Sequence, residues 1–458
     1  MFAAWLCLLF LLWLSPGPAQ AESPSIPDVT LAPAQVVAAG PIAFSPPSLQ
    51  YDAAGTLHVV WQEKPDSQGL VKSLRLAGAS RRPDDPVQVS SVGLGPDALH
   101  QAPAVTVGGE DQVFVSWSTA NRAAGAMFAS DLRVASSRDG GRSFSPPVLV
   151  NDDGLPIAHT FDDILRGPEQ DLYVMWLDGR GKDRSGAAVQ FACSRDGGAT
   201  FSPTLTVDGM ACPCCRPMLA AAPDGSLWAA WRKTFDGHVR DIVVAQSTDR
   251  GRTFGSPRLV HEDHWVFSAC PHRGPSLGFD RRGRLYVAWY TEGTDEQARI
   301  YLAVSDDQAK SFTEPILLHT STNSLPDNLR MAVHPEGMVA AVWEEVTGVR
   351  KRVVLRLSLD RGKTFGAVLP LSAGTKAERS RCYSSIGNIR LGPGPSTSFP
   401  RTRSSCKKAE SILRNRRGHR EPAASCPGWF GEGTGPSLSS GGEQRWSCLG
   451  SPSTLPLV

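Results

Sequence analysis

The chain has 458 residues, of which 41% are hydrophobic and 20% are charged, with 44 glycines and 36 prolines. This apolar content suffices to bury a large core, which excludes a mainly disordered chain and a collagen-like repeat. Residues 376–458 hold 13 Lys and Arg against 5 Glu, whereas residues 1–375 hold 34 basic and 40 acidic side chains. The body of the protein is therefore mildly acidic, and we do not expect it to bind nucleic acid.

The chain begins with an apolar run from Ala3 to Leu14, followed by the small-residue pattern Ala19-Gln20-Ala21. This pattern is typical of a secretory signal peptide. It predicts a signal over residues 1–21, a linker over 22–39 and an exported protein, periplasmic or secreted. The run is shorter than the roughly 20 residues of a membrane span, so we expect no transmembrane segment.

Two sequence ladders with one period run through the middle of the chain. The first consists of strands that end in tryptophan, and its tryptophans are Trp61, Trp117, Trp176, Trp231, Trp289 and Trp343. The second consists of boxes of the type Ser-x-Asp-x-Gly-x-Ser/Thr-Phe, and its aspartates are Asp139, Asp196, Asp249, Asp307 and Asp360. Successive members of both ladders are 53–59 residues apart. Such a regular period predicts a repeat architecture.

Each repeat contains four short strand patterns, which is the content of one propeller blade. The sequence thus predicts an all-β, six-bladed β-propeller over residues 40–372, with four antiparallel strands per blade. In each box the short carboxylate can accept hydrogen bonds from nearby backbone N–H groups, and the glycine permits a positive φ. We expect the boxes to be structural and to close the hairpin between the third and fourth strands. One carboxylate per turn offers too few oxygens for calcium.

The boxes resemble the Asp-box, or BNR, repeats of the sialidase-like β-propellers over roughly residues 40–372. The resemblance implies an active site on the face opposite the boxes, built from residues that open each first strand and residues that follow each tryptophan. It also implies a glycoside hydrolase of the exo-sialidase type that acts on an acidic glycan. We expect the ligand to be a glycan or another anionic small molecule, and the protein to be a monomer.

The resemblance assigns roles to residues at that face. Catalytic roles fall to Tyr290 as nucleophile with Glu292 as its partner, and to Asp163 as acid/base. The candidates for binding the anionic ligand are Arg216, Arg232, His272, Arg273 and Arg330, since Arg can grip a carboxylate with two parallel hydrogen bonds.

One motif of the family is missing. Its first blade opens on a Phe/Tyr-Arg-Ile-Pro motif, but residues 39–46 contain no Arg. A non-catalytic propeller that binds a glycan or a protein therefore stays open as an alternative, with Tyr290 in packing and the Arg residues in ion pairs between blades.

Cysteines supply a separate signal. Cys212, Cys214 and Cys215 precede Arg216, and Cys270 precedes His272. The two segments open neighbouring repeats, so we expect them to meet at the rim of the site. These motifs are also similar to those of a group of bacterial sialidase-like proteins. In an exported protein such cysteines favour disulfides; a zinc or Cu(I) site that includes His272 is the alternative, and it would make the protein metal- or redox-linked. We expect no other cofactor.

Residues 373–458 form a tail rich in Ser, Gly, Pro and Arg, in which both ladders stop and Asp is absent after Lys376. This composition is typical of a disordered extension or of a shifted reading frame. We assign the tail no function. A blade lost to a frame shift would make the number of blades seven instead of six.

Overall fold

A computed structural model describes residues 43–64, 69–77, 82–95, 102–109, 111–121, 128–180, 186–372 and 375–376. The chain divides into two compact units, Met1–Ser398 and Phe399–Val458, and every described residue belongs to the first. The signal peptide over 1–21, the linker over 22–39 and all but two residues of the tail over 373–458 lie outside the described residues, and they stay predictions.

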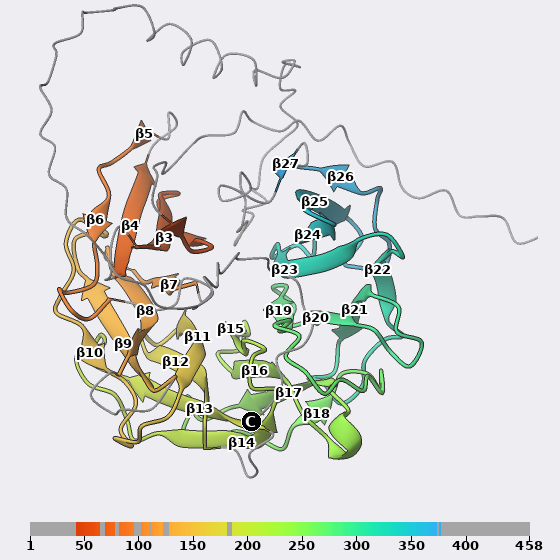
Figure 1. Cartoon of the computed structure of the whole chain (residues 1–458), viewed down its shortest axis with the longest axis horizontal. Coiled ribbons are helices and arrows are strands. Elements are labelled where there is room, and N and C mark those ends of the chain that lie inside the picture. The colour runs from red at the N-terminus through yellow and green to blue at the C-terminus, as the bar shows by residue number, and fades with distance from the viewer. Residues whose placement is uncertain are drawn as a thin grey trace, which may run out of the picture. The chain divides into compact units, whose positions relative to one another are not determined.

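The described strands form six antiparallel sheets that follow one another around a ring (Figure 1), which confirms the predicted six-bladed β-propeller. The first sheet comprises β1 (Ala43–Phe44), β2 (Ser48–Tyr51), β3 (Leu57–Lys64), β4 (Leu70–Ala77), β5 (Arg82–Pro83) and β6 (Val87–Gln88). The second comprises β7 (Ala104–Val107), β8 (Val113–Ala120), β9 (Ser130–Ser137) and β10 (Val148–Leu149). The third comprises β11 (His159–Arg166), β12 (Leu172–Asp178), β13 (Ala187–Ser194) and β14 (Leu205–Ala211).

The remaining three sheets repeat the same plan. The fourth comprises β15 (Met218–Ala221), β16 (Leu227–Arg232), β17 (Ile242–Ser247) and β18 (Arg258–Leu259), with the 3₁₀ turn η2 (Asp236–His238) between β16 and β17. The fifth comprises β19 (Ser276–Phe279), β20 (Leu285–Thr291), β21 (Arg299–Ser305) and β22 (Ile316–Thr320). The sixth comprises β23 (Leu325–Val333), β24 (Val339–Thr347), β25 (Arg350–Ser358), β26 (Leu369–Pro370) and β27 (Thr375–Lys376).

The innermost strand of each sheet is its first main strand. Contacts between neighbouring sheets run from β2 to β7, and on through β11, β15 and β19 to β23. The labels of β7, β11, β15, β19 and β23 surround the ring centre in Figure 1. Among the described strands, no comparably extensive contact joins the sixth sheet to the first. The residues of these inner strands therefore decide what the ring centre presents to a ligand.

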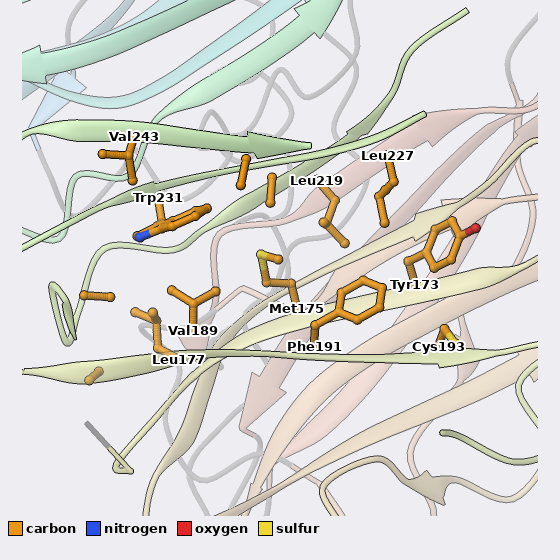
Figure 2. Packing of buried hydrophobic residues seen from close by; sticks show 14 residues of the cluster. Tyr173, Met175, Leu177, Val189, Phe191, Cys193, Leu219, Leu227, Trp231 and Val243 are labelled. Atoms are coloured by element: carbon orange, nitrogen blue, oxygen red, sulfur yellow. The ribbon is translucent and has the colours of Figure 1, made fainter. Parts of the chain in front are cut away.

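The core lies between neighbouring sheets. Figure 2 shows the cluster between the third and fourth sheets, where Met175 and Phe191 face Leu219 and Trp231. All six tryptophans of the ladder lie on the second main strand of their sheet and are at most 4% exposed. Burial of such a large aromatic side chain is among the strongest contributions that one residue makes to a core. The tryptophan ladder thus holds each sheet against its neighbours.

In the second to sixth sheets a box closes the turn between the third and fourth main strands. In the third sheet, Ser194 donates a hydrogen bond to Asp196 at 2.7 Å and accepts one from the backbone N–H of Gly198 at 2.8 Å, while Thr200 donates to Asp196 at 2.5 Å. Gly198 has a φ of +84°, a conformation that glycine adopts without the penalty of a Cβ atom. The hydrogen bonds hold the pKa of Asp196 at about 2, although burial acts in the opposite direction.

None of the helical turns in the described part of the chain has the length and apolar character that a membrane crossing requires. Its five cysteines, Cys193, Cys212, Cys214, Cys215 and Cys270, are all free thiols.

We expect Ser194→Ala to destabilise the protein by about 1–3 kcal/mol, because the buried N–H of Gly198 would lose its acceptor. Urea unfolding monitored by tryptophan fluorescence measures the effect. The control is Ser256→Ala at an exposed site, for which a change within about 0.5 kcal/mol is expected. Equal stability of the two variants would contradict a structural role for the box.

Candidate functional site

The end of the sheets opposite the boxes collects the polar residues of interest. In an antiparallel sheet, the start of the first strand, the end of the second and the start of the third lie at the same end of the sheet. Each box follows the third strand and therefore lies at the opposite end. Residues that open a first strand and residues that follow a tryptophan therefore share one end of the ring. This end carries all the candidate catalytic and ligand-binding residues.

Strand pairing places Asp163 and Arg330 at equivalent positions of their sheets. Asp163 pairs with Met175 and Arg330 pairs with Val342, in each case the residue that precedes the ladder tryptophan. The equivalent residues of the other sheets are Ser48, Ala104, Met218 and Ser276. Asp163 and Arg330 are thus the two charged residues at this level, and they belong to the third and sixth sheets, which lie opposite each other in a ring of six.

Both of these inner strands contain a bulge at the same place. The register of β11 shifts between Thr160 and Asp163, and that of β23 shifts between Asp327 and Arg330. Phe161 and Asn328, inside the two bulges, have φ values of +55° and +52°. A β-bulge re-aims the side chains that follow it and is common beside active sites. The bulges therefore set the direction in which Asp163 and Arg330 point.

Asp163 is a carboxyl group in an unusual environment. It is partly exposed, and its Oδ2 accepts a hydrogen bond from the backbone N–H of Leu219 at 2.8 Å. Burial raises its pKa to about 6, although the N–H of Leu219 and the charges of Arg216 and Arg330 act to lower it. A carboxyl group whose pKa is raised toward neutral pH is still protonated in part of the molecules there and can act as a general acid.

Arg330 is exposed although it lies on an innermost strand, so water reaches the ring centre at this level. Its one hydrogen bond within the described residues goes from Nη1 to the carbonyl of Leu329 at 2.9 Å. A guanidinium has five N–H donors, so most donors of Arg330 have no hydrogen-bond partner among the described residues.

Arg216 connects neighbouring sheets and adds positive charge at the same end. Its Nη1 donates to the carbonyl of Asp162, and its Nη2 donates to the carbonyl of Ala102 at 2.6 Å. Gly274 lies against this segment so closely that a Cβ atom there would come within 2.1 Å of the Arg216 carbonyl oxygen. The position of Arg216 therefore depends on a glycine in the next sheet.

Tyr290 and Glu292 are in direct contact. The Tyr290 hydroxyl donates a hydrogen bond to Oε1 of Glu292, and the guanidinium carbon of Arg273 lies 4.4 Å from the centre of the tyrosine ring. Tyr290 is 2% exposed, and burial together with the Glu292 hydrogen bond raises its pKa well above the usual range. The phenol is thus packed and neutral, and its role as nucleophile stays a prediction.

Arg273, which contacts Tyr290, also lies near Asp327, three residues before Arg330. Arg273 donates to the carbonyls of Pro271 at 3.0 Å and Pro326 at 3.2 Å, and its Nε lies 3.9 Å from Oδ1 of Asp327. The Asp327 side chain is 29% exposed. The sequence analysis missed Asp327, although its place three residues before Arg330, at the opening of the same strand, was a usable signal.

Arg232 is completely buried between the fourth and fifth sheets. It donates hydrogen bonds to the carbonyls of Tyr290 at 2.6 Å, Arg240 at 2.7 Å and Arg273 at 3.1 Å, and its guanidinium lies 4.8 Å from the ring centre of Trp265. In this structure its N–H groups serve the protein backbone. Arg232 therefore supports the segment that carries Arg273, and a direct role in ligand binding stays a prediction.

The two cysteine motifs meet at the same end of the ring. The Sγ atom of Cys212 lies 3.0 Å from that of Cys215 and 3.8 Å from that of Cys214. Cys270, at the opening of the neighbouring repeat, is close enough to interact with Cys214 electrostatically, but it is not among the three sulfurs that lie within 4.8 Å of one another. His272 is exposed, and its ring centre lies 5.8 Å from that of Phe161. The structure thus brings Cys212, Cys214 and Cys215 together, and it places Cys270 and His272 next to them at the same end of the ring.

Arg240 contacts the cysteine cluster and was not among the predicted site residues. Its Nη1 donates a hydrogen bond to Sγ of Cys212 at 3.0 Å. Burial raises the pKa of the Cys212 thiol, but hydrogen bonds with Cys214 and Cys215 and the charge of Arg240 together hold it well below its usual range. The cluster therefore favours one thiolate at Cys212.

A second cluster at this end consists of Asp153, His159 and Asp178. Nε2 of His159 lies 3.2 Å from Asp153 and 3.7 Å from Asp178, and Arg180 forms ion pairs with both carboxylates at 3.4 and 2.6 Å. Arg180 thus supplies one positive charge to the two carboxylates of this cluster.

No protein family matches the sequence, and no curated protein matches it. Solved structures with a similar fold include a protein of unknown function from Dyadobacter fermentans, at 15% identity over 69% of this chain and 94% of that chain, with a TM-score of 0.47. They also include the intramolecular trans-sialidase from Ruminococcus gnavus, at 13% identity over 67% and 90% of the two chains with a TM-score of 0.45. An α-L-arabinofuranosidase from Fusarium graminearum shares 13% identity over 69% and 92%, with a TM-score of 0.48.

We expect the stability difference between the wild type and Asp163→Asn to depend on pH. The pKa of Asp163 rises from 3.8 to about 6 on folding, so its carboxyl favours the folded state below pH 3.8, and this contribution is lost as the pH rises through 6. The wild type should therefore lose stability relative to the variant between about pH 4 and pH 7. Urea unfolding of both proteins at several pH values measures the difference, and a constant difference would contradict the raised pKa.

We expect Arg232→Met to destabilise the protein by about 3 kcal/mol or more, because three buried carbonyls would lose their donor. The matched control is Arg252→Met at an exposed position, which should change the stability by no more than about 0.5 kcal/mol. Differential scanning calorimetry of the two variants provides the comparison. A change in stability of less than about 1 kcal/mol for Arg232→Met would show that the guanidinium does not stabilise the contact between these sheets.

Proposed function

We propose that the end of the ring opposite the boxes binds an acidic glycan and hydrolyses its glycosidic bond. The observation that supports this function best is the placement of Asp163 and Arg330 at equivalent positions of opposite sheets, at a level that water reaches. The arrangement offers an acid for the leaving group and a cation for the anionic part of the ligand at one place.

The anionic group of the sugar would bind Arg330, with the positive charge of Arg216 in support. Most N–H donors of Arg330 have no partner among the described residues, and a guanidinium fits a carboxylate through two parallel hydrogen bonds. Arg273 adds a third positive charge beside Asp327. This group of three cations is the reason to propose an acidic glycan over a neutral one.

Asp163 would protonate the glycosidic oxygen. With a pKa of about 6, it still carries its proton in a useful fraction of molecules near neutral pH, as a general acid requires. Glycosidases need a second group on the other side of the bond. We assign this role to Asp327 in preference to Tyr290, because the Asp327 side chain is 29% exposed whereas Tyr290 is 2% exposed; Tyr290 with Glu292 stays the alternative.

A second candidate function is binding of the same acidic glycan without hydrolysis. It is favoured by the buried state of Tyr290 and by the hydrogen bond that ties its hydroxyl to Glu292. In either case we propose an exported protein, on the basis of the apolar segment over residues 3–14. We also propose that it is a monomer.

The test uses the full chain with fluorogenic glycosides of sialic acid and glucuronic acid, and with a neutral arabinofuranoside as comparison. We expect turnover of an acidic glycoside and little of the neutral one. Asp163→Asn should lower kcat by about 10²–10⁴-fold, because general acid catalysis is lost. Arg330→Gln and Arg273→Ala should mainly raise KM, and Arg252→Gln, at an exposed site on the box side, is the matched control.

Two outcomes would contradict hydrolysis of an acidic glycan. One is undiminished turnover in Asp163→Asn, and the other is equal turnover of acidic and neutral substrates. If nothing is hydrolysed, calorimetric titration with sialic acid and glucuronic acid decides the second candidate: binding that Arg330→Gln abolishes supports a binding propeller, and no binding rejects both functions.

A further inference from the structure

The four cysteines at the end of the ring have no part in the proposed glycan chemistry. We propose that Cys212, Cys214, Cys215 and Cys270 form a binding site for a thiophilic metal ion with a filled d shell, Zn²⁺ or Cu⁺. This inference is independent of the proposed function, since it rests on other side chains and its test measures metal.

The sulfur positions suit a metal ion. Metal–sulfur bonds of about 2.3 Å in a tetrahedral site place neighbouring sulfurs about 3.8 Å apart. The Sγ atoms of Cys212 and Cys214 are 3.8 Å apart, and those of Cys212, Cys214 and Cys215 all lie within 4.8 Å of one another. The closer pair, Cys212 and Cys215 at 3.0 Å, would need to separate by about 0.8 Å to match the same geometry.

Three mutually adjacent sulfurs argue for a metal more than for a disulfide. One disulfide joins two sulfurs at about 2.05 Å and leaves the third sulfur of this group without a partner. A second disulfide, to Cys270, would be needed to pair it. A metal ion accepts all three, and Cys270, which lies in the neighbouring repeat outside the group of sulfurs within 4.8 Å of one another, would have to move toward them to supply a fourth ligand. The ligand set is then complete in the Cys₄ form that is common for structural zinc, and soft thiolates also select Cu⁺.

Burial and access differ within the cluster in a way that suits metal entry. Cys212, Cys214 and Cys215 are 0%, 4% and 1% exposed, whereas Cys270 is exposed. A metal ion would therefore arrive from the side of Cys270 and become enclosed by the other three sulfurs. An enclosed ligand set with an entry path is what a metal site requires.

The charges around the cluster are also appropriate. Four thiolates and Zn²⁺ carry two excess negative charges, and Cu⁺ leaves one more. Arg240 donates a hydrogen bond to Sγ of Cys212 at 3.0 Å, and the buried charge of Arg232 acts on Cys215. Donors of this kind around a metal orient its ligands and tune their affinity. Arg240 and Arg232 can therefore offset the excess charge.

The experiment uses the full chain, purified with a reductant and without oxygen. We expect about one equivalent of zinc or copper per chain by mass spectrometry of the metals. After removal of the metal, titration with Co²⁺ should produce thiolate-to-cobalt absorption in the near ultraviolet. Titration with Cu⁺ in competition with bicinchoninate tests the copper arm, and the metal that is retained at the lower free concentration identifies the ion.

Cys214→Ser and Cys270→Ser should each weaken metal binding by at least about 10-fold. The matched control is Cys193→Ser, which removes a buried free thiol outside the cluster and should leave binding unchanged. Circular dichroism shows whether each variant is folded; where a variant is not, the titrations of the reduced wild type decide the matter alone. Failure of the reduced wild type to bind either metal would overturn the proposal, as would mass spectrometry that finds the four cysteines in disulfides after purification without reductant.

Discussion

The packing of each sheet against the next through its buried second strand is the constraint on which the rest of the structure depends. The ladder tryptophans are nearly inaccessible to solvent, and apolar residues of neighbouring sheets interdigitate around them, as Met175 and Trp231 do. Because this contact has the same geometry in every repeat, each sheet is turned relative to the previous one in the same sense. A ring follows, and with it a centre that receives one inner strand from every sheet.

The ring makes neighbours of residues that are far apart in the chain. Asp163 and Arg330 are separated by nearly half of the propeller sequence, yet they reach the same level from opposite sheets because their strands pair in the same register. The two bulges then break the regular alternation of side chains at this level. A regular scaffold with two local irregularities thus carries a carboxyl group of raised pKa on one sheet and, on the opposite sheet, a guanidinium with one hydrogen bond among the described residues.

The fourth and fifth sheets add a different chemistry at the same end. Arg232 and Arg240, both buried, hold the segments between these sheets together, and Arg240 also donates to the Cys212 sulfur. Arg232 contacts the backbone of Tyr290 and Arg273 as well. The cysteine cluster and the Arg273–Tyr290 pair therefore share one support.

The sequence by itself determined the fold, because two ladders of equal period predict a repeat of four-stranded units, as in a propeller. The turns could also be predicted, because the hydrogen bonds of residues such as Asp196 and the positive φ of Gly198 depend only on neighbouring residues. The period also predicted that the segments around Cys212 and Cys270 open neighbouring repeats. Only the tertiary structure decided which polar residues meet: it set Asp163 opposite Arg330, added Asp327 and Arg240, and buried Arg232 and Tyr290. The physical reason is that the burial, pKa and free donors of a side chain depend on atoms from distant repeats and on bulges that no period in the sequence encodes.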